Sequence, residues 1–196
     1  MPLTAFVLAF QVYKGIIDEV PDEDSPLGPV HPGQEQMVAI KAYQQQAYES
    51  FKNEYCIYSL PELKHDNILK LLGCEERQIS PPTLEYCLVF EYYENGSLYE
   101  YLKNNTVSFP ELLKICLGIA AGLSHLHNND SSIVLHRDIK SKNVLLRGDL
   151  TACISDFNLA IVLHKNEPPP ENLDQSGTVR LVRRRFRFAC SLLSTF

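Results

Sequence analysis

The stretch HRDIKSKNVLL, residues 136–146, decides how the rest of the chain is interpreted. It carries a carboxylate, an ammonium group and an amide close together, on Asp138, Lys140 and Asn143. Phosphoryl transfer needs a base near the accepting hydroxyl, a cation at the transferred phosphate and oxygen ligands for magnesium. The stretch therefore indicates this chemistry, with Asp138 as the base, Lys140 at the phosphate and Asn143 as a metal ligand.

Two further motifs complete the set. SDF, residues 155–157, provides Asp156 as a second metal ligand, and VAIK, residues 38–41, places Lys41 on a strand where it can reach the α- and β-phosphates. The helix expected after this strand carries Glu54, which can pair with Lys41. Each motif alone is weak, because a lone HRD arises by chance and a strand lysine is usually solvated. Their order and spacing together favour a nucleotide and metal site.

Composition limits the other classes of function. The 196 residues include 45% hydrophobic residues and carry a formal net charge of −6, which argues against nucleic acid as the main partner. The six cysteines form no C-x-x-C pair and are interpreted as reduced thiols. The apolar run near the start is too short to cross a bilayer. We expect no membrane span, and a chain that is soluble and cytoplasmic by itself.

The first half of the chain is patterned mainly for strands. Residues 18–36 are acidic and rich in proline, which predicts a loop. Short apolar runs predict three strands, at residues 37–43, 67–73 and 86–93. A loop over 77–83 is expected between the last two. Phe51, Tyr55 and Tyr58 recur at helical spacing between the first two strands.

The second half begins with a helix signal. Ser108 and Glu111 fit a capping box, which predicts a helix from there to about His127. The residues expected along its apolar face are Leu112, Ile115, Ile119, Leu123 and Leu126. We expect this face to be exposed in the present chain, because the helices that would cover it do not follow in the sequence. Short strand-like pieces follow at residues 133–138, 143–148 and 151–157.

The ordered motifs resemble the protein kinase catalytic domain. The resemblance implies an α+β, two-lobed fold with a small β-rich lobe that contains one helix, and an incomplete helical lobe. Lysine two positions after Asp138 is typical of serine/threonine kinases. Between about residues 37 and 180 the chain is similar to the type II receptors of the transforming growth factor β family, closest to the activin type II receptors. The stretches that carry this similarity are NEYCIYSLPELKHDNILKLLG, EYYENGSL, HRDIKSKNVLL and LTACISDF.

The resemblance also implies ATP-binding residues beyond Lys41 and Glu54. Phe90 would be the gatekeeper, and the backbone of Glu91 and Tyr93 would bind adenine. The residues that would enclose the nucleotide are Ala39, Leu145 and Val12, the last matching the valine of a glycine-rich loop. An alternative remains open for Phe90, Ala39, Leu145 and Tyr58, which would be core residues in almost any fold.

Two structural features are implied as well. Phe157, His136 and Tyr58 would stack as a hydrophobic column that links the lobes. Arg137, beside the catalytic base, would steady an ordered activation segment.

Three features depart from the family pattern. Bulky Val7 and Phe10 occupy positions where the phosphate-covering loop has glycines. Asn158 replaces the glycine of DFG, and asparagine is the most tolerable substitute because it adopts the left-handed conformation more readily than most residues. After SGTVR, residues 176–180, the chain continues as a basic segment instead of YMAPE.

These observations lead to a function and an alternative. The resemblance implies a receptor serine/threonine kinase domain that uses ATP with Mg²⁺ or Mn²⁺, and whose partner and substrate is a type I receptor kinase at the cytoplasmic side of the plasma membrane. The alternative is a catalytically impaired, truncated form or fragment that at most binds nucleotide or partners. The expected organisation is an atypical strand region (1–17), an acidic loop (18–36), a small lobe (37–93), a partial large lobe (94–180) and a divergent basic tail (181–196).

Overall fold

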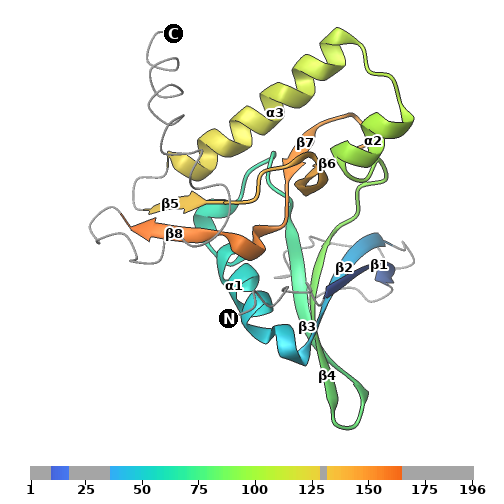
Figure 1. Ribbon diagram of the computed structural model, residues 1–196, viewed down its shortest axis with the longest axis vertical. Helices are drawn as coiled ribbons and strands as arrows, with labels where there is room; N and C mark the ends of the chain where they lie inside the picture. The colour runs from blue at the N-terminus through green and yellow to red at the C-terminus, as the bar shows by residue number, and fades with distance from the viewer. Residues whose placement is uncertain (1–9, 18–35, 129–131, 165–196) are drawn as a thin grey trace, which may run out of the picture.

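The computed structural model describes residues 10–17, 36–128 and 132–164, which form two lobes (Figure 1). The small lobe is an antiparallel sheet of order β1-β2-β4-β3 with one helix beside it. Its elements are β1 (Phe10–Ile17), β2 (Gln36–Gln44), α1 (Tyr48–Tyr58), β3 (Leu71–Ser80) and β4 (Thr83–Glu91). This lobe confirms the predicted β-rich architecture with one helix.

The second lobe contains the remaining helices and two small antiparallel sheets. Its helices are α2 (Leu98–Asn104) and α3 (Phe109–His127). Its strands are β5 (Ser132–Leu135), paired with β8 (Ile161–His164), and β6 (Val144–Leu146), paired with β7 (Ala152–Ile154). The predicted α+β class is confirmed. The predictions on Val7, the acidic loop, SGTVR and the basic tail fall outside the described residues.

The predicted strand at 67–73 is wrong in its first half. β3 begins only at Leu71, and residues 67–70 form a link between the lobes. The Ile154 N–H donates to the Asn67 carbonyl at 2.8 Å, and the Leu69 N–H donates to the Ile154 carbonyl at 2.9 Å. The backbone of Asn67 and Leu69 is therefore bonded to β7 of the other lobe, whereas the Lys70 carbonyl already accepts the Glu91 N–H of β4 at 3.3 Å.

The predicted loop at 77–83 is also shorter than expected. β3 continues to Ser80 and turns directly into β4 at Thr83. Arg77 and Glu85 lie opposite each other in this hairpin, and their side chains form an ion pair at 3.1 Å. The pairing of β3 with β4 therefore continues through charged residues, where the sequence predicted a loop.

The α3 capping box is present as predicted. Ser108 accepts from the Glu111 N–H, and the Glu111 carboxylate accepts from the Ser108 N–H at 2.7 Å. Ile115 and Leu126 are buried, with Ile119 and Leu123 packed against core clusters, so the predicted exposure of this face is wrong. Of the predicted face only Leu112 is exposed, and the other exposed large apolar side chains of α3 are Phe109, Leu113 and Leu117.

Two glycines explain the close packing of α3 against the link. A Cβ at Gly118 would lie 2.9 Å from the side-chain Nδ2 of Asn67, and a Cβ at Gly122 would lie 2.8 Å from the backbone carbonyl oxygen of Asn67. At Gly122, where the contact is with the backbone, any larger residue would force the link away from the helix. By length and composition alone α3 is also long and apolar enough to cross a membrane, a test that the core helix of a globular domain can pass too. Its buried residues nevertheless pack in the described core.

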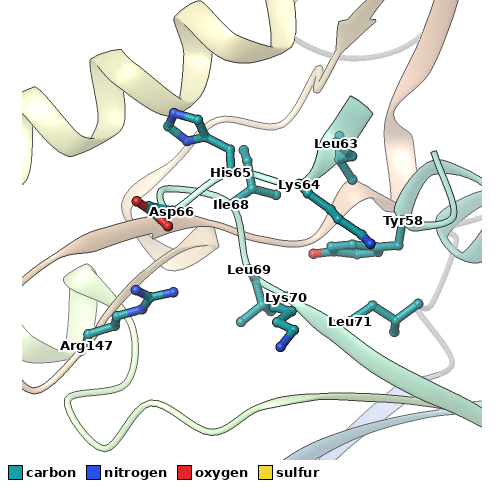
Figure 2. Close-up of a pocket in the computed structure, with 10 residues that line it drawn as sticks. All are labelled: Tyr58, Leu63, Lys64, His65, Asp66, Ile68, Leu69, Lys70, Leu71 and Arg147. Atoms are coloured by element: carbon teal, nitrogen blue, oxygen red, sulfur yellow. The ribbon is translucent and has the colours of Figure 1, made fainter. Parts of the chain in front are cut away.

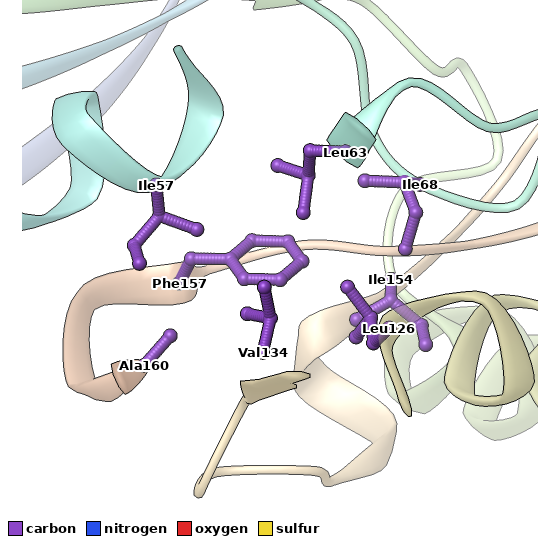
Figure 3. Close-up of a cluster of buried hydrophobic side chains, with 8 residues drawn as sticks. All are labelled: Ile57, Leu63, Ile68, Leu126, Val134, Ile154, Phe157 and Ala160. Carbon is purple, nitrogen blue, oxygen red and sulfur yellow. The ribbon is translucent and has the colours of Figure 1, made fainter. Parts of the chain in front are cut away.

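One buried cluster joins the lobes (Figure 3). The Phe157 ring lies in its middle, next to Ile57 from α1 and Val134 from β5. The other members are Leu63, Ile68, Leu126, Ile154 and Ala160. Because this cluster draws on both lobes, the segment that starts at Phe157 is fixed by the core. The five cysteines within the described residues are free, as predicted.

Candidate active site

Lys41 is the centre of a buried ionic cluster between the lobes. It lies in the middle of β2, with β1 on one side and β4 on the other. Its Nζ is 2.7 Å from Glu54 Oε2 and 2.7 Å from Asp156 Oδ1. The structure therefore brings together three predicted site residues that are far apart in the sequence.

Glu54 is fixed from several directions. It lies on the inner side of α1 and is fully buried. Tyr43 donates its hydroxyl hydrogen to Oε2, and the Phe157 backbone N–H donates to Oε1 at 3.0 Å. Burial raises the pKa of the Glu54 carboxyl, and the neighbouring Lys41 ammonium opposes this rise. The carboxyl consequently holds both the strand lysine and the start of the segment after Asp156.

The catalytic stretch forms a second, more exposed cluster. Lys140 Nζ donates to Asp138 Oδ2 at 2.5 Å. Asn143 Nδ2 donates to the same oxygen and to the Asp138 carbonyl, each at 2.9 Å. These contacts fix one carboxylate oxygen. The other oxygen can then accept a proton from a bound hydroxyl.

His136 connects the stretch 136–146 to the segment that contains Asp156. Its Nε2 donates to the Ser155 carbonyl at 2.8 Å, and its Nδ1 accepts the Asp138 N–H at 3.2 Å. This pair of contacts requires a neutral ring that carries its hydrogen on Nε2. Burial lowers the pKa of His136, which favours that neutral form. The Ser155 N–H also donates to the Asn143 carbonyl at 2.9 Å, so Asn143 and Asp156 are held on neighbouring segments.

The chemistry of Asn143 and Asp156 fits a magnesium ion. The Asn143 amide nitrogen is used by Asp138, which leaves its amide oxygen for a metal. Asp156 adds a partly exposed carboxylate next to it. Mg²⁺ prefers one or two protein oxygens together with phosphate oxygens and water. The described residues contain no cluster of three or more His, Cys, Asp or Glu side chains placed to hold a metal ion.

The predicted adenine-site residues gather where β2 and β4 meet the second lobe. Phe90 and Tyr93 are buried members of one cluster, and Ala39 and Leu145 pack against it. Glu91 ends β4, where its side chain accepts the Tyr93 hydroxyl hydrogen at 3.1 Å. Val12 lies opposite Lys41 on β1, with an exposed side chain. Burial fits a core role for Phe90 equally well, so the nucleotide roles stay predictions.

The predicted aromatic column is present. The Phe157 ring centroid is 5.1 Å from that of Tyr58 and 4.8 Å from that of His136. Tyr58 in turn lies 4.9 Å from Phe90. The column therefore extends from the small-lobe sheet to the catalytic stretch and passes through the residue that follows Asp156. Arg137, which was expected to steady the activation segment, has a left-handed backbone with φ of 68°.

Asn158 does not use the conformation that the sequence suggested. The left-handed residue of this segment is Asp156, with φ of 66° and ψ of 67°. Asn158 lies within the 3₁₀ helix η4 (Phe157–Leu159), and it is not among the described residues with positive φ. Asn158 therefore replaces the glycine of the family pattern at a position where the backbone does not need the left-handed conformation that favours glycine.

A separate pocket of about 490 Å³ lies on the link between the lobes (Figure 2). Its lining includes Tyr58, Leu69, Lys70 and Arg147, and Figure 2 shows Tyr58 and Arg147 at opposite sides of it. None of the predicted catalytic or metal residues lines it. It is distinct from the site around Lys41.

Three residues of the site were missed by sequence reasoning. Tyr43 holds Glu54, Asn67 fixes the link to β7, and Asn53 binds carbonyl groups of the segment after Asp156. Asn53 is the only one with a sequence signal, because it directly precedes Glu54 on α1. The partners of all three lie in distant segments, which local patterns do not reveal.

Comparison with known proteins agrees with this geometry. The model of a family described as protein tyrosine and serine/threonine kinase matches residues 10–180. Activin receptor type-2A from Xenopus laevis is 45% identical over 150 residues, which are 73% of this chain and 29% of that receptor. The Homo sapiens activin receptor type-2A is 42% identical over the same shares. The Xenopus laevis activin receptor type-2B is 39% identical over 151 residues, again 73% of this chain and 29% of that receptor.

Proposed function

Because the chain belongs to the protein tyrosine and serine/threonine kinase family, we propose that it transfers the γ-phosphate of ATP to serine or threonine hydroxyls of a protein. The observation that carries this proposal is Lys41 Nζ held 2.7 Å from both Glu54 and Asp156. This arrangement presents an ammonium group and a metal-binding carboxylate to one nucleotide. The serine/threonine preference rests on Lys140 and on the similarity to the activin receptors.

Each residue of the site would have its own role in the reaction. Lys41 would bind the α- and β-phosphates, and Asn143 and Asp156 would hold Mg²⁺ or Mn²⁺, which neutralises charge on the phosphates. Asp138 would accept the proton of the substrate hydroxyl while the hydroxyl oxygen forms a bond to the γ-phosphorus and the bond between this phosphorus and ADP breaks. Lys140 would leave Asp138 to contact the transferred phosphate. Adenine would bind beside Phe90, between Ala39 and Leu145.

The partners and the cellular place are proposed from the same similarity. The substrate would be a type I receptor kinase, and the site would work at the cytoplasmic side of the plasma membrane as part of a longer receptor. Transfer of labelled phosphate from Mg·ATP to a serine-containing protein substrate tests the activity. Transfer that is equal in the wild type and in Asp138→Asn would refute it.

A second candidate is nucleotide binding without transfer. It is favoured by the sequence around Val12, where β1 carries its glycine at Gly15 and not at the positions that cover the phosphates. A thermal shift with Mg·ATP separates the two. Stabilisation by Mg·ATP without any label transfer would favour the second candidate, and measurable turnover would exclude it.

A further inference from the structure

Two adjacent residues of α1 bind both ends of η4. At its start, Glu54 Oε1 accepts the Phe157 N–H at 3.0 Å. At its end, Asn53 Nδ2 donates to the Asn158 carbonyl at 2.9 Å and to the Ala160 carbonyl at 3.2 Å. The ends of a short helix leave backbone groups without internal partners, and buried groups of this kind need them from elsewhere. α1 supplies both.

These contacts determine where Asp156 lies. η4 follows Asp156 directly, and Phe157, Asn158 and Ala160 are all buried. Asp156 has a left-handed backbone, which is unfavourable for a non-glycine residue and persists only when its surroundings hold it. The Phe157 ring fixes one side of the segment through the core, and Asn53 fixes the carbonyl groups on the other. Asn53 is therefore the polar contact between α1 and the C-terminal end of η4.

We propose that Asn53 is a positioning residue that holds Asp156 in its metal-binding position by fixing η4 to α1. This inference rests on the proposed nucleotide and metal site. Asn53 itself touches neither nucleotide nor metal. Its effect passes through the backbone of η4 to Asp156, so it acts on the metal-dependent part of nucleotide binding, while Glu54 still holds Lys41.

The test compares Asn53→Asp with the wild-type chain. Aspartate keeps the size of the side chain and removes both hydrogen-bond donors. Ser59→Ala is the matched control, because it removes a side-chain contact to the Tyr55 carbonyl at the end of α1 without touching η4. For each chain the dissociation constant of ATP is measured with Mg²⁺ and with EDTA. Hydrogen exchange is followed over residues 156–160.

The ratio of the two dissociation constants measures how well Asp156 is placed to bind the metal, because this carboxylate would contact the nucleotide only through the metal. In Asn53→Asp we expect the gain in affinity from Mg²⁺ to shrink about tenfold and exchange over 156–160 to accelerate, because both hydrogen bonds to the Asn158 and Ala160 carbonyls are lost and the new carboxylate repels these oxygens. Affinity in EDTA should stay within about twofold of the wild type. Ser59→Ala should match the wild type in every measurement.

Other results overturn the inference in different ways. Unchanged exchange in Asn53→Asp, or equal weakening with Mg²⁺ and with EDTA, would show that Asn53 serves only the stability of α1. A wild-type chain that binds no Mg·ATP would refute the proposed function and the positioning role together. Normal wild-type binding with an unchanged ratio in Asn53→Asp would refute the positioning role alone.

Discussion

The candidate active site contains two lysine–carboxylate clusters, in which the ion-pair distances are similar but one lysine is buried and the other exposed. Lys41 Nζ is 2.7 Å from Glu54 and from Asp156, and its side chain is 7% exposed. Lys140 Nζ is 2.5 Å from Asp138, and its side chain is 48% exposed. A buried charge that loses its partner keeps its desolvation cost, whereas an exposed charge regains water. We therefore expect the first cluster to stabilise the fold and the second to contribute little to stability.

The largest expected effect comes from Lys41→Met. This change leaves two carboxylates facing each other in the interior without their cation. We expect the free energy of unfolding to fall by about 3–5 kcal/mol and the thermal shift with Mg·ATP to disappear. Urea denaturation measures the first and a thermal melt with nucleotide measures the second. A loss below about 1 kcal/mol would show that the buried cluster contributes no more than an exposed one.

Asp138→Asn tests the exposed cluster by its chemistry. The amide oxygen can still accept from Lys140, but the side chain no longer takes a proton. Label transfer should fall by about 10²–10⁴-fold, while the free energy of unfolding stays within about 1 kcal/mol of wild type. Rates are measured at saturating Mg·ATP. Large destabilisation in this variant would contradict the division between the two clusters.

His136 lies between the clusters and should make stability depend on pH. Burial lowers its pKa in the folded chain, so the unfolded chain binds the proton at higher pH. Stability is full above about pH 6.5 and is lost as pH falls through the folded pKa, by up to about 1.4 kcal/mol per pH unit. His136→Phe keeps a ring against Phe157 and should reduce this slope. It should not abolish it, because burial lowers the pKa values of His65 and His127 as well.

The measurement is urea denaturation at several pH values between about 5 and 8. His164→Gln is the control, because His164 is exposed at the end of β8. The control should keep the wild-type slope. An unchanged slope in His136→Phe would show that this ring does not carry the proton linkage.

The sequence predicted the parts of this arrangement that short motifs encode. Asp138, Lys140 and Asn143 all lie within the short segment 138–143, so the sequence spacing alone predicts that they are close together. Glu54 follows from helical periodicity after a strand. The capping box at Ser108 marked the start of α3, because its two contacts are local.

The rest depends on partners distant in sequence. Ile68 and Leu69 gave residues 67–73 the apolar pattern of a strand, but the backbone of Asn67 and Leu69 pairs with Ile154 of the other lobe. The periodicity of α3 indicated an apolar face but not what covers it, and that face packs inward near Ala152 and Ile154. Asn158 was judged by the conformation of the glycine it replaces, whereas the left-handed residue is Asp156. Local patterns carry no information on such contacts.

The smallest expected effect on stability belongs to Lys140→Ala. The variant removes an ammonium group that is half exposed, and water solvates the Asp138 carboxylate in its place. The free energy of unfolding should change by less than about 1 kcal/mol at low salt. This difference should vanish near 1 M salt, where screening acts over about 3 Å. Destabilisation by Lys41→Met should persist there, because salt screens buried charges much less. Salt titration of both variants in urea therefore sharpens the comparison, and a salt-independent loss of about 3 kcal/mol in Lys140→Ala would show that Asp138 is held as rigidly as Glu54.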